Sequence, residues 1–182
     1  ANNPEHQYNT PSTYDVKLIA LSNLGCKDSI AKNMVVRPSP VTAFSINDSQ
    51  QCFNGNAFSF SNNSSISSGA LTYNWDMGDG NTATTKDFAH QYASDDTFQV
   101  KLLSTSNLGC KDSLVKKAYV FPSPEPEFGI NDSSQCFERN NFIFYNQSSI
   151  NSGNMFYNWA FGDGSTSTMT TPQHSYSQPD TY

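Results

Sequence analysis

Residues 73–80 decide the fold of this chain, and they read Tyr73-Asn74-Trp75-Asp76-Met77-Gly78-Asp79-Gly80. An aromatic-rich stretch leads directly into a turn signal. The glycines can adopt positive φ angles, and the Asp79 side chain can bond the backbone next to it. The rest of the chain agrees: it has 13 Phe and 9 Tyr, whereas long helices favour Ala, Leu, Glu and Lys. The stretch therefore predicts short strands joined by polar turns.

Outward from this stretch, the chain repeats itself with a period of 84 residues, which is the first feature to look for in any sequence. Residues 39–98 align without a gap on residues 123–182, and 31 of the 60 aligned positions are identical. The spacing is shared by His6, His90 and His174, by Cys26 and Cys110, by Cys52 and Cys136, and by Trp75 and Trp159. Most solenoid units span only about 20–45 residues, so this period predicts small separate domains in tandem.

The period divides the chain into the end of one repeat (1–38), a complete repeat (39–122) and the start of a third (123–182). The joints are Pro38-Ser39-Pro40 and Pro122-Ser123-Pro124. Two prolines so close together stiffen a linker in an extended form. Both ends of the chain fall inside a repeat, so we expect the chain to be part of a longer tandem array.

Alternating apolar and polar residues mark the strands of each repeat. One such run holds Phe58 and Phe60, and a second holds Phe98, Val100 and Leu102. The equivalent positions one repeat earlier are Tyr14, Val16 and Leu18. Between two strand-like runs, Asn107-Leu108-Gly109 predicts a hairpin. About seven short strands separated by turns indicate an all-β sandwich.

Composition excludes several classes of function. The net charge is -6, whereas a surface that binds nucleic acid needs clustered Lys and Arg. No apolar run reaches the roughly 18 residues that a membrane-spanning helix requires. Four cysteines in so polar a chain fit an oxidising, extracellular or periplasmic compartment, and the absence of a C-x-x-C pair argues against zinc.

Three motifs recur in order and at fixed spacing, and together they resemble the PKD (polycystic kidney disease) repeat. The family pattern reads W-D-F-G-D-G, then H-x-Y, then T-Y-x-V-x-L. The chain matches it with Trp75 to Gly80, His90-Gln91-Tyr92 and Thr97-Phe98-Gln99-Val100-Lys101-Leu102, and again with Trp159 to Gly164, His174-Ser175-Tyr176 and Thr181-Tyr182. The resemblance covers essentially the whole chain and departs at Ala160, where the family usually has Asp.

The resemblance implies an immunoglobulin-like sandwich of seven strands in each repeat, and an extracellular spacer, adhesion or binding role. Its cysteine pattern looks like that of PKD repeats in large surface proteins of Bacteroidota, some of them gliding-motility adhesins or fibres. The residues expected to build the structural motif are Trp75, Gly78, Asp79, Gly80, His90 and Tyr92, and then Trp159, Gly162, Asp163, Gly164, His174 and Tyr176.

Catalysis by an acid–base cluster is the first sharp alternative. Asp76, Asp79 and His90 have suitable side chains, but Asp76 is replaced by Ala160 in the next repeat. A pair of carboxylates is therefore not a repeated feature. We interpret Asp79 and Asp163 as turn formers and His90 as a strand residue that packs or hydrogen-bonds. With no nucleophile and base in view, the sequence predicts no catalytic residue.

Calcium is the second alternative, because some PKD-like modules bind it through loop carboxylates. The ion needs six to eight oxygen ligands. The loops at Asn47-Asp48-Ser49 and Asn131-Asp132-Ser133 offer one carboxylate each. Asp95-Asp96 offers two, but Pro179-Asp180 stands at the equivalent place. The sequence favours structural turns and no cofactor.

The cysteines pose a question of connectivity. In an immunoglobulin-like order Cys52 falls in the first loop and Cys110 in the last hairpin, at opposite ends of the domain. A 10-residue strand is about 33 Å long, and a disulfide needs Cα atoms within about 7 Å. Cys52 could reach Cys110 only if the first loop folds back. Otherwise each repeat is linked to its neighbour, which geometry slightly favours, and Cys26 and Cys136 behave likewise. Buried free thiols are the third alternative.

Two serines are candidates for O-glycosylation. Asp28-Ser29-Ile30 and Asp112-Ser113-Leu114 resemble the D-S/T-aliphatic acceptor of exported Bacteroidota proteins. Both are expected on an exposed turn after the hairpin cysteine. The alternative is that Asp and Ser simply suit a turn.

The sequence therefore predicts a non-enzymatic spacer or stalk of a secreted or bacterial cell-surface adhesin or fibre. Its expected partners are neighbouring repeats, and surface polysaccharide or another surface protein, with no nucleic acid and no inserted membrane segment. A second hypothesis is a carbohydrate- or protein-binding module that uses exposed aromatics such as Tyr119 or Phe88, although Phe88 is Pro172 in the third repeat. A third is an accessory domain of a secreted hydrolase.

Overall fold

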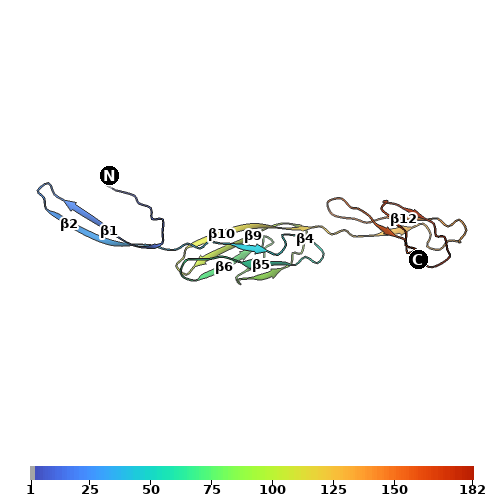
Figure 1. The fold of residues 1–182 in the computed structure, drawn as a ribbon, viewed down its shortest axis with the longest axis horizontal. Helices are drawn as coiled ribbons and strands as arrows, with labels where there is room; N and C mark the ends of the chain where they lie inside the picture. The colour runs from blue at the N-terminus through green and yellow to red at the C-terminus, as the bar shows by residue number, and fades with distance from the viewer. Residues whose placement is uncertain (1–2) are drawn as a thin grey trace. The chain divides into compact units, whose positions relative to one another are not determined.

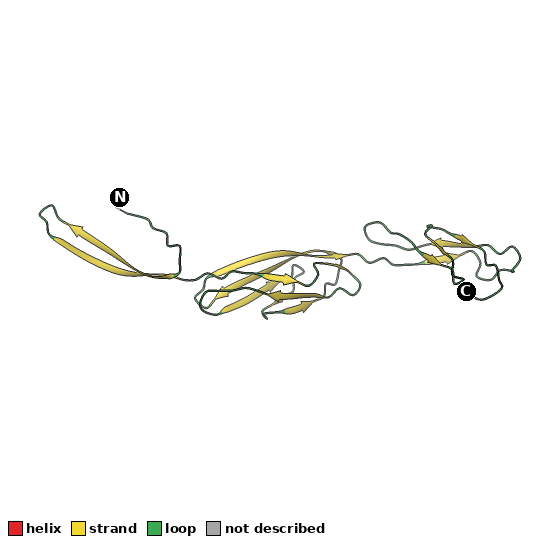
Figure 2. Cartoon of the chain, in the orientation of Figure 1, coloured by secondary structure: helices red, strands yellow, loops and turns green. Residues whose placement is uncertain are grey.

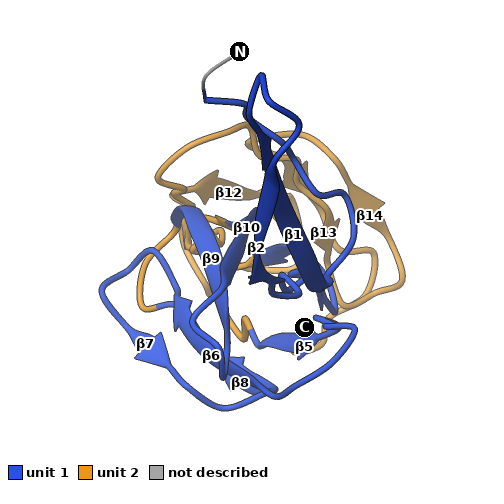
Figure 3. Ribbon diagram, turned by 90° about the vertical axis from the view of Figure 1, so that its left-hand side faces the viewer, with its two compact units in different colours: residues 1–51, 57–92, 96–119 blue, residues 52–56, 93–95, 120–182 orange. Residues whose placement is uncertain are grey.

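The computed structural model describes residues 3–182, and every regular element in that range is a β-strand (Figure 2). This confirms the all-β class. No helix within that range is long and apolar enough to cross a bilayer. The chain divides into two compact units (Figure 3). The first holds residues 1–51, 57–92 and 96–119, and the second holds 52–56, 93–95 and 120–182.

The chain begins with an isolated antiparallel hairpin, drawn in blue in Figure 1. Its strands are β1 (Ser12–Leu21) and β2 (Lys27–Val36), which pair from Ser12↔Val36 to Leu21↔Lys27. Gly25 takes the positive φ of 83° that the tight turn needs. The hairpin corresponds, 84 residues earlier, to the last two strands of the middle repeat.

The middle repeat is a two-layer sandwich. Its strands are β3 (Phe44–Ile46), β4 (Gln50–Cys52), β5 (Phe58–Asn62), β6 (Leu71–Asp76), β7 (Thr82–Ala83), β8 (Phe88–His90), β9 (Asp96–Ser106) and β10 (Lys111–Phe121). One sheet has the order β4-β10-β9-β6-β7, and the other has the order β3-β5-β8. Two facing sheets of this kind, in which β4 runs parallel to β10, form the expected immunoglobulin-like sandwich.

The core of this sandwich is aromatic. Phe58 and Phe60, which alternate along β5, are buried, as are Val100 and Leu102 on β9. Trp75 is fully buried and meets the ring of Phe60 at 6.0 Å. The period-two runs thus place their apolar side chains inward as predicted. Burial of each large apolar side chain contributes about 1.5–3 kcal/mol.

The third segment has five shorter strands. They are β11 (Phe128–Ile130), β12 (Phe142–Asn146), β13 (Trp159–Ala160), β14 (Thr166–Ser167) and β15 (Gln173–His174). One sheet has the order β11-β12-β15, and β13 pairs with β14 alone. These strands match β3, β5, β6, β7 and β8, so the same sequence pattern builds the same layers. Phe144 and Phe161 form the buried part of this core.

Two loop assignments made from the sequence were wrong. Ser29 and Ser113 lie in β2 and β10 and not on turns, although both are exposed. The reason is that the tight turn ends at Cys110, where the Ser106 amide donates to the Cys110 carbonyl at 2.8 Å, so the strand begins at the next residue. Cys52 likewise ends the short strand β4, because that strand pairs with β10.

Candidate functional site

A histidine–aspartate pair joins strand β8 to the turn that follows β6. The His90 Nε2 atom lies 2.8 Å from Oδ2 of Asp79, and both side chains are mostly buried. Asp79 also accepts hydrogen bonds from the backbone amide of Asn81 at 3.0 Å and from its side-chain amide at 2.9 Å. The carboxylate therefore ties its own turn to a strand that lies eleven residues further along the chain.

The third segment repeats this arrangement. His174 Nε2 lies 2.7 Å from Oδ2 of Asp163, which also accepts a bond from the Ser165 amide at 2.9 Å. The Ser165 hydroxyl donates to Asp163 and lies 3.4 Å from His174 Nε2. A nucleophilic triad needs the serine and the aspartate on different ring nitrogens. Here both face the same nitrogen, so the three residues form a structural cluster.

The carboxylates are held in their charged form. Burial acts to raise the pKa of Asp79, but the hydrogen bonds from Asn81 and His90 together outweigh it and keep that pKa below its usual value. The Ser165 side chain, with help from the Ser165 backbone and His174, lowers the pKa of Asp163 to about 2. Both turns are therefore anionic at neutral pH.

A tyrosine completes the unit in each repeat. The Tyr92 ring packs edge-on against His90, with centroids 4.6 Å apart, and stacks on Phe98 at 3.9 Å. Its hydroxyl donates to the Met77 carbonyl at 3.0 Å. Burial raises the pKa of Tyr92 far above its usual value, so the hydroxyl remains a donor. Tyr176 makes the same bond to the Phe161 carbonyl at 2.7 Å.

The tryptophan and the first glycine of the motif lock the turn to the sheets. The Trp75 Nε1 donates to the Thr85 carbonyl at 3.0 Å, and the Trp159 Nε1 donates to the Met169 carbonyl at 2.8 Å. Gly78 has a φ of 81°, and a Cβ atom there would lie 2.9 Å from backbone atoms of Gln99. Only glycine fits without a shift of β9.

A family model described as PKD domain matches residues 37–121 and 122–182, so it covers most of the chain. The chain belongs to the PKD domain family. The recognised family and the tandem organisation are thereby confirmed. PKD domains are generally non-catalytic accessory modules, and they occur in extracellular proteins, including surface proteins and secreted proteases.

Three solved structures are similar to parts of the chain. The PKD1 domain of Vibrio anguillarum Epp is 24% identical, with a TM-score of 0.40, over 45% of this chain and 93% of that one. The PKD1 domain from Vibrio cholerae metalloprotease PrtV is 28% identical, with a TM-score of 0.40, over 45% and 96%. Carbohydrate-binding modules from the beta-sandwich superfamily are 19% identical, with a TM-score of 0.43, over 58% and 54%. Comparison with curated proteins finds no match.

The two cysteines of the complete PKD repeat lie at opposite ends of strand β10. Cys110 directly precedes β10, and there Arg37 donates to the neighbouring Leu108 carbonyl at 2.8 Å. At the far end, the amide of Phe53 donates to the Phe121 carbonyl at 2.7 Å, next to Cys52. Eleven residues of strand span about 35 Å, and a disulfide tolerates about 7 Å. In this structure the two cysteines of one repeat therefore lie too far apart for a disulfide between them.

All four cysteines are free thiols in the structure. Cys26, Cys52 and Cys136 are exposed, and Cys110 is half-buried. Cys26 occupies the same hairpin turn as Cys110, and Cys136 is the equivalent of Cys52 in a stretch that forms no strand.

The loop carboxylates considered for calcium are used in turns. Asp48 accepts from the Gln50 amide at 2.9 Å, and Asp132 accepts from the Ser134 amide at 2.9 Å. Across residues 3–182, no three His, Cys, Asp or Glu side chains gather as metal ligands would.

The aromatic residues considered for sugar binding belong to the PKD sheets. Phe88 stacks on Phe60 at 5.0 Å and meets Trp75 at 5.1 Å, so its ring forms part of the core. Tyr119 is half-buried on β10, and its amide donates to the Ser49 carbonyl at 2.8 Å. Phe88, like Tyr119, is half-buried.

Sequence reasoning missed that Asp79 and His90 bond to each other. It assigned the aspartate to the turn and the histidine to a strand, each with a separate role. Two signals were available: both residues recur at the 84-residue period, and both repeats keep eleven residues between them. A charged and a titratable residue that recur together at one spacing indicate a contact.

Proposed function

We propose that the chain is a non-enzymatic spacer of a large secreted or bacterial cell-surface adhesin or fibre. The observation that carries the proposal is the position of the two joints. The segment that enters the complete repeat bonds to the hairpin before β10, through Arg37 and Leu108. The segment that leaves it follows the other end of β10 at Phe121. Entry and exit therefore lie about 35 Å apart, the length of an 11-residue strand.

The polar motif supports a structural role. In each repeat the aspartate, the histidine and the tyrosine hydroxyl of the motif all bond to groups of the same repeat. A site for substrate needs groups that point into an open pocket. These groups instead hold a turn against a strand, and they do so twice.

Small-angle X-ray scattering of the 182-residue chain, extrapolated to zero concentration, tests the spacer proposal. A compact globule of this length has a radius of gyration of about 16 Å. Segments joined end to end at about 35 Å per repeat give a rod of roughly 100 Å and a radius of gyration near 30 Å. A value close to the compact one would contradict the spacer role.

Disulfides between consecutive repeats are part of the same proposal. Cys52 lies at the exit of its repeat, where the Asn54 amide donates to Ser123 Oγ of the following joint at 2.9 Å. Cys110 lies at the entry. The exit cysteine of one repeat would then pair with the hairpin cysteine of the next. Two thiols form one S–S bond and release two protons and two electrons, which a disulfide oxidase or molecular oxygen accepts.

The proposed disulfide between consecutive repeats can be tested on the chain extended by a second copy of residues 99–122. This extension completes the third repeat and adds a hairpin cysteine. After air oxidation, peptide mapping should find Cys52 joined to that added cysteine. Cys52→Ser should leave the added cysteine free, whereas Cys26→Ser should not affect it. Recovery of Cys52 and the added cysteine as free thiols from the oxidised extended chain would rule out the disulfide between repeats.

O-glycosylation of Ser29 and Ser113 remains compatible with this role. Both hydroxyls are on exposed strand positions of equivalent hairpins. Residues 1–182 expressed in the native host should have an intact mass above the polypeptide mass of 20.1 kDa. Ser29→Ala with Ser113→Ala should remove the excess, and a native mass equal to the bare chain would exclude the modification.

A further inference from the structure

The turn that leads from β4 to β5 contains the one Asn-Gly pair of the chain, Asn54-Gly55. The Asn56 amide donates to the Phe53 carbonyl at 3.3 Å, which closes a turn around the pair. Gly55 has a φ of 79°, as the third position of a type II β-turn requires. Asn54 and Gly55 are both exposed. The pair therefore lies at the surface of the complete repeat.

The two groups of this pair that can react with each other are not engaged elsewhere. The Asn54 backbone amide donates to Ser123 Oγ at 2.9 Å, but within residues 3–182 the Asn54 side chain takes part in no hydrogen bond. The Gly55 amide likewise has no acceptor in that range. Apart from its chain neighbours, no atom lies within 4 Å of the place that a Cβ of Gly55 would occupy. The space beside this glycine is therefore open.

An asparagine side chain can close a five-membered ring with the backbone nitrogen of the next residue. Here the Gly55 nitrogen would lose its proton and form a bond to Cγ of Asn54, while the bond from Cγ to the side-chain nitrogen breaks. That nitrogen leaves as ammonia. Water then opens the cyclic imide at one of its two carbonyl carbons, which gives aspartate or isoaspartate. Water is the only co-reactant, and nothing is oxidised or reduced.

We propose that Asn54 is a modification site, at which the folded chain deamidates spontaneously through a cyclic imide with Gly55. Glycine favours the ring closure because it has no Cβ that would hinder its nitrogen. An exposed turn also opens at little cost, which lets the backbone of Asn54 rotate into the reactive arrangement. The proposal does not depend on the spacer role.

Two Asp-Gly pairs can follow the same chemistry, but the fold restrains them. In Asp79-Gly80, the carboxylate accepts hydrogen bonds from the backbone and the side chain of Asn81 and is bonded to His90. In Asp163-Gly164, the carboxylate is bonded in a similar way. A carboxyl group must be protonated to lose water in the ring closure, and these bonds favour the charged form. The sequence thus offers three reactive pairs, and the fold leaves one of them unrestrained.

A neighbouring asparagine shows the protected case within the same turn. Asn56 is only 3% exposed, and its side-chain nitrogen donates to the Phe53 carbonyl at 2.8 Å. That nitrogen would have to leave as ammonia from a buried and bonded position. The next residue is Ala57, whose Cβ hinders its nitrogen. Asn56 is therefore an internal control for Asn54.

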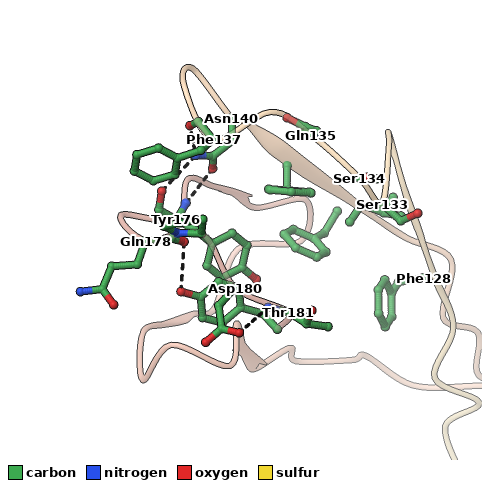
Figure 4. Close-up of a pocket in the computed structure, with 15 residues that line it drawn as sticks. Phe128, Ser133, Ser134, Gln135, Phe137, Asn140, Tyr176, Gln178, Asp180 and Thr181 are labelled. Atoms are coloured by element: carbon green, nitrogen blue, oxygen red, sulfur yellow. Dashed lines mark hydrogen bonds between the residues drawn. The ribbon is translucent and has the colours of Figure 1, made fainter.

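The third segment keeps the shape of this turn without the reactive pair. Figure 4 shows Phe137 and Asn140 at the two ends of the turn, where the Asn140 amide donates to the Phe137 carbonyl at 3.4 Å. Between them stand Glu138 and Arg139, and Arg139 takes a φ of 65°. The turn therefore accepts a residue other than glycine, and it accepts a carboxylate at the position equivalent to Asn54.

Deamidation changes the complete repeat at its exit. Each converted Asn54 adds one negative charge to a chain whose net charge is -6. In the isoaspartate form the backbone runs through the former side chain, so the turn gains one methylene group. The Asn54 amide donates to Ser123 Oγ of the joint. The isoaspartate form therefore lengthens the turn directly after this contact.

Prolonged incubation of the 182-residue chain in mildly alkaline buffer, folded and in guanidinium chloride, tests the proposal. Peptide mapping by mass spectrometry, with an isoaspartyl methyltransferase to mark isoaspartate, follows each pair. In the folded chain Asn54 should convert at a rate within about tenfold of its rate in guanidinium chloride, because an exposed turn opens at little cost. The two Asp-Gly pairs and Asn56 should be slowed more than Asn54 is. Equal protection of all these sites by the fold, or an Asn54 that stays amidated while the unfolded chain converts, would overturn the proposal.

Gly55→Arg and Asn54→Asp are the matched variants. Gly55→Arg introduces the residue that the third segment has at this position of the turn, so the fold should be kept, as circular dichroism can verify. Its side chain hinders the ring closure, and Asn54 should convert about tenfold or more slowly. Asn54→Asp supplies the reaction product, and aged wild-type chain should gain a species at its isoelectric point. An unchanged rate of conversion in Gly55→Arg would overturn ring closure with Gly55.

Discussion

The His90 Nε2 atom lies 2.8 Å from Oδ2 of Asp79, and the pair His174–Asp163 repeats this contact 84 residues later at 2.7 Å. In each repeat the bond connects the Gly-Asp-Gly turn to the edge strand of the opposite sheet. A turn that exposes its polar groups would otherwise be free to move away from the sandwich. The pair is thus a clasp between the two layers of each repeat.

The clasp predicts a loss of stability in acid. The folded-state pKa of Asp79 lies below its usual value and that of Asp163 is about 2. The stabilisation is therefore present above the unfolded value of about 3.9 and is lost as pH falls through the folded values. Urea midpoints measured by tryptophan fluorescence should fall between pH 4 and pH 2.

Asp79→Asn should lower the urea midpoint at pH 6 and flatten its change between pH 4 and pH 2, because the variant has no carboxylate to protonate at this site. Asp15→Asn, on the exposed N-terminal hairpin, removes one charge without touching the clasp. In this variant the urea midpoint should change between pH 4 and pH 2 as it does in the wild type. If Asp79→Asn also kept the wild-type change of the midpoint with pH, the role assigned to the Asp79 carboxylate would be contradicted.

The two glycines of the turn should tolerate alanine differently. Both have positive φ angles, 81° for Gly78 and 92° for Gly80, so alanine at either costs about 1 kcal/mol or more. A Cβ at Gly78 would also meet the Gln99 backbone at 2.9 Å, whereas nothing lies within 4 Å of one at Gly80. Gly78→Ala should therefore be more destabilising by a further 1–3 kcal/mol, roughly, measured by urea unfolding. Equal losses of unfolding free energy in the two variants would show that the backbone of β9 shifts at little cost.

The two tryptophans offer another matched comparison. Trp75 is fully buried and Trp159 only half-buried, although both donate to a carbonyl ten residues away. Trp75→Phe should lower the free energy of unfolding of the middle repeat by about 2 kcal/mol or more, since it leaves a cavity and an unpaired carbonyl. Trp159→Phe should cost less. A larger loss of stability in Trp159→Phe than in Trp75→Phe would mean that Trp159 is fully covered in solution.

Thiol chemistry checks the positions of the cysteines. Cys52 and Cys110 lie at the two ends of an 11-residue strand, so oxidation of dilute chain should not join them. Four thiols per chain should react with Ellman's reagent, and Cys110, the half-buried one, should react more slowly. A Cys52–Cys110 peptide in a non-reducing digest would contradict the topology.

Much of the fold was predictable because local chemistry and the repeat register agree. The alternation of Phe58 with Phe60 and of Val100 with Leu102 set the buried faces of β5 and β9, since successive strand residues point to opposite sides. Register arithmetic also showed that Asp76 is not repeated. Ser29 and Ser113 were predicted on turns, but the tight turn is too short to include them. The length of a turn depends on how the strands pair, and the sequence indicates strand ends only approximately.

By itself the sequence determined the all-β class, the 84-residue period, the family and the motif residues, because strand alternation, glycine turns and identical spacing are local properties of the chain. Only the packing of the strands decided two further things. It brought Asp79 to His90, and it separated Cys52 from Cys110. Each depends on which strands lie side by side, and that is set by the burial of two facing sheets rather than by any one segment.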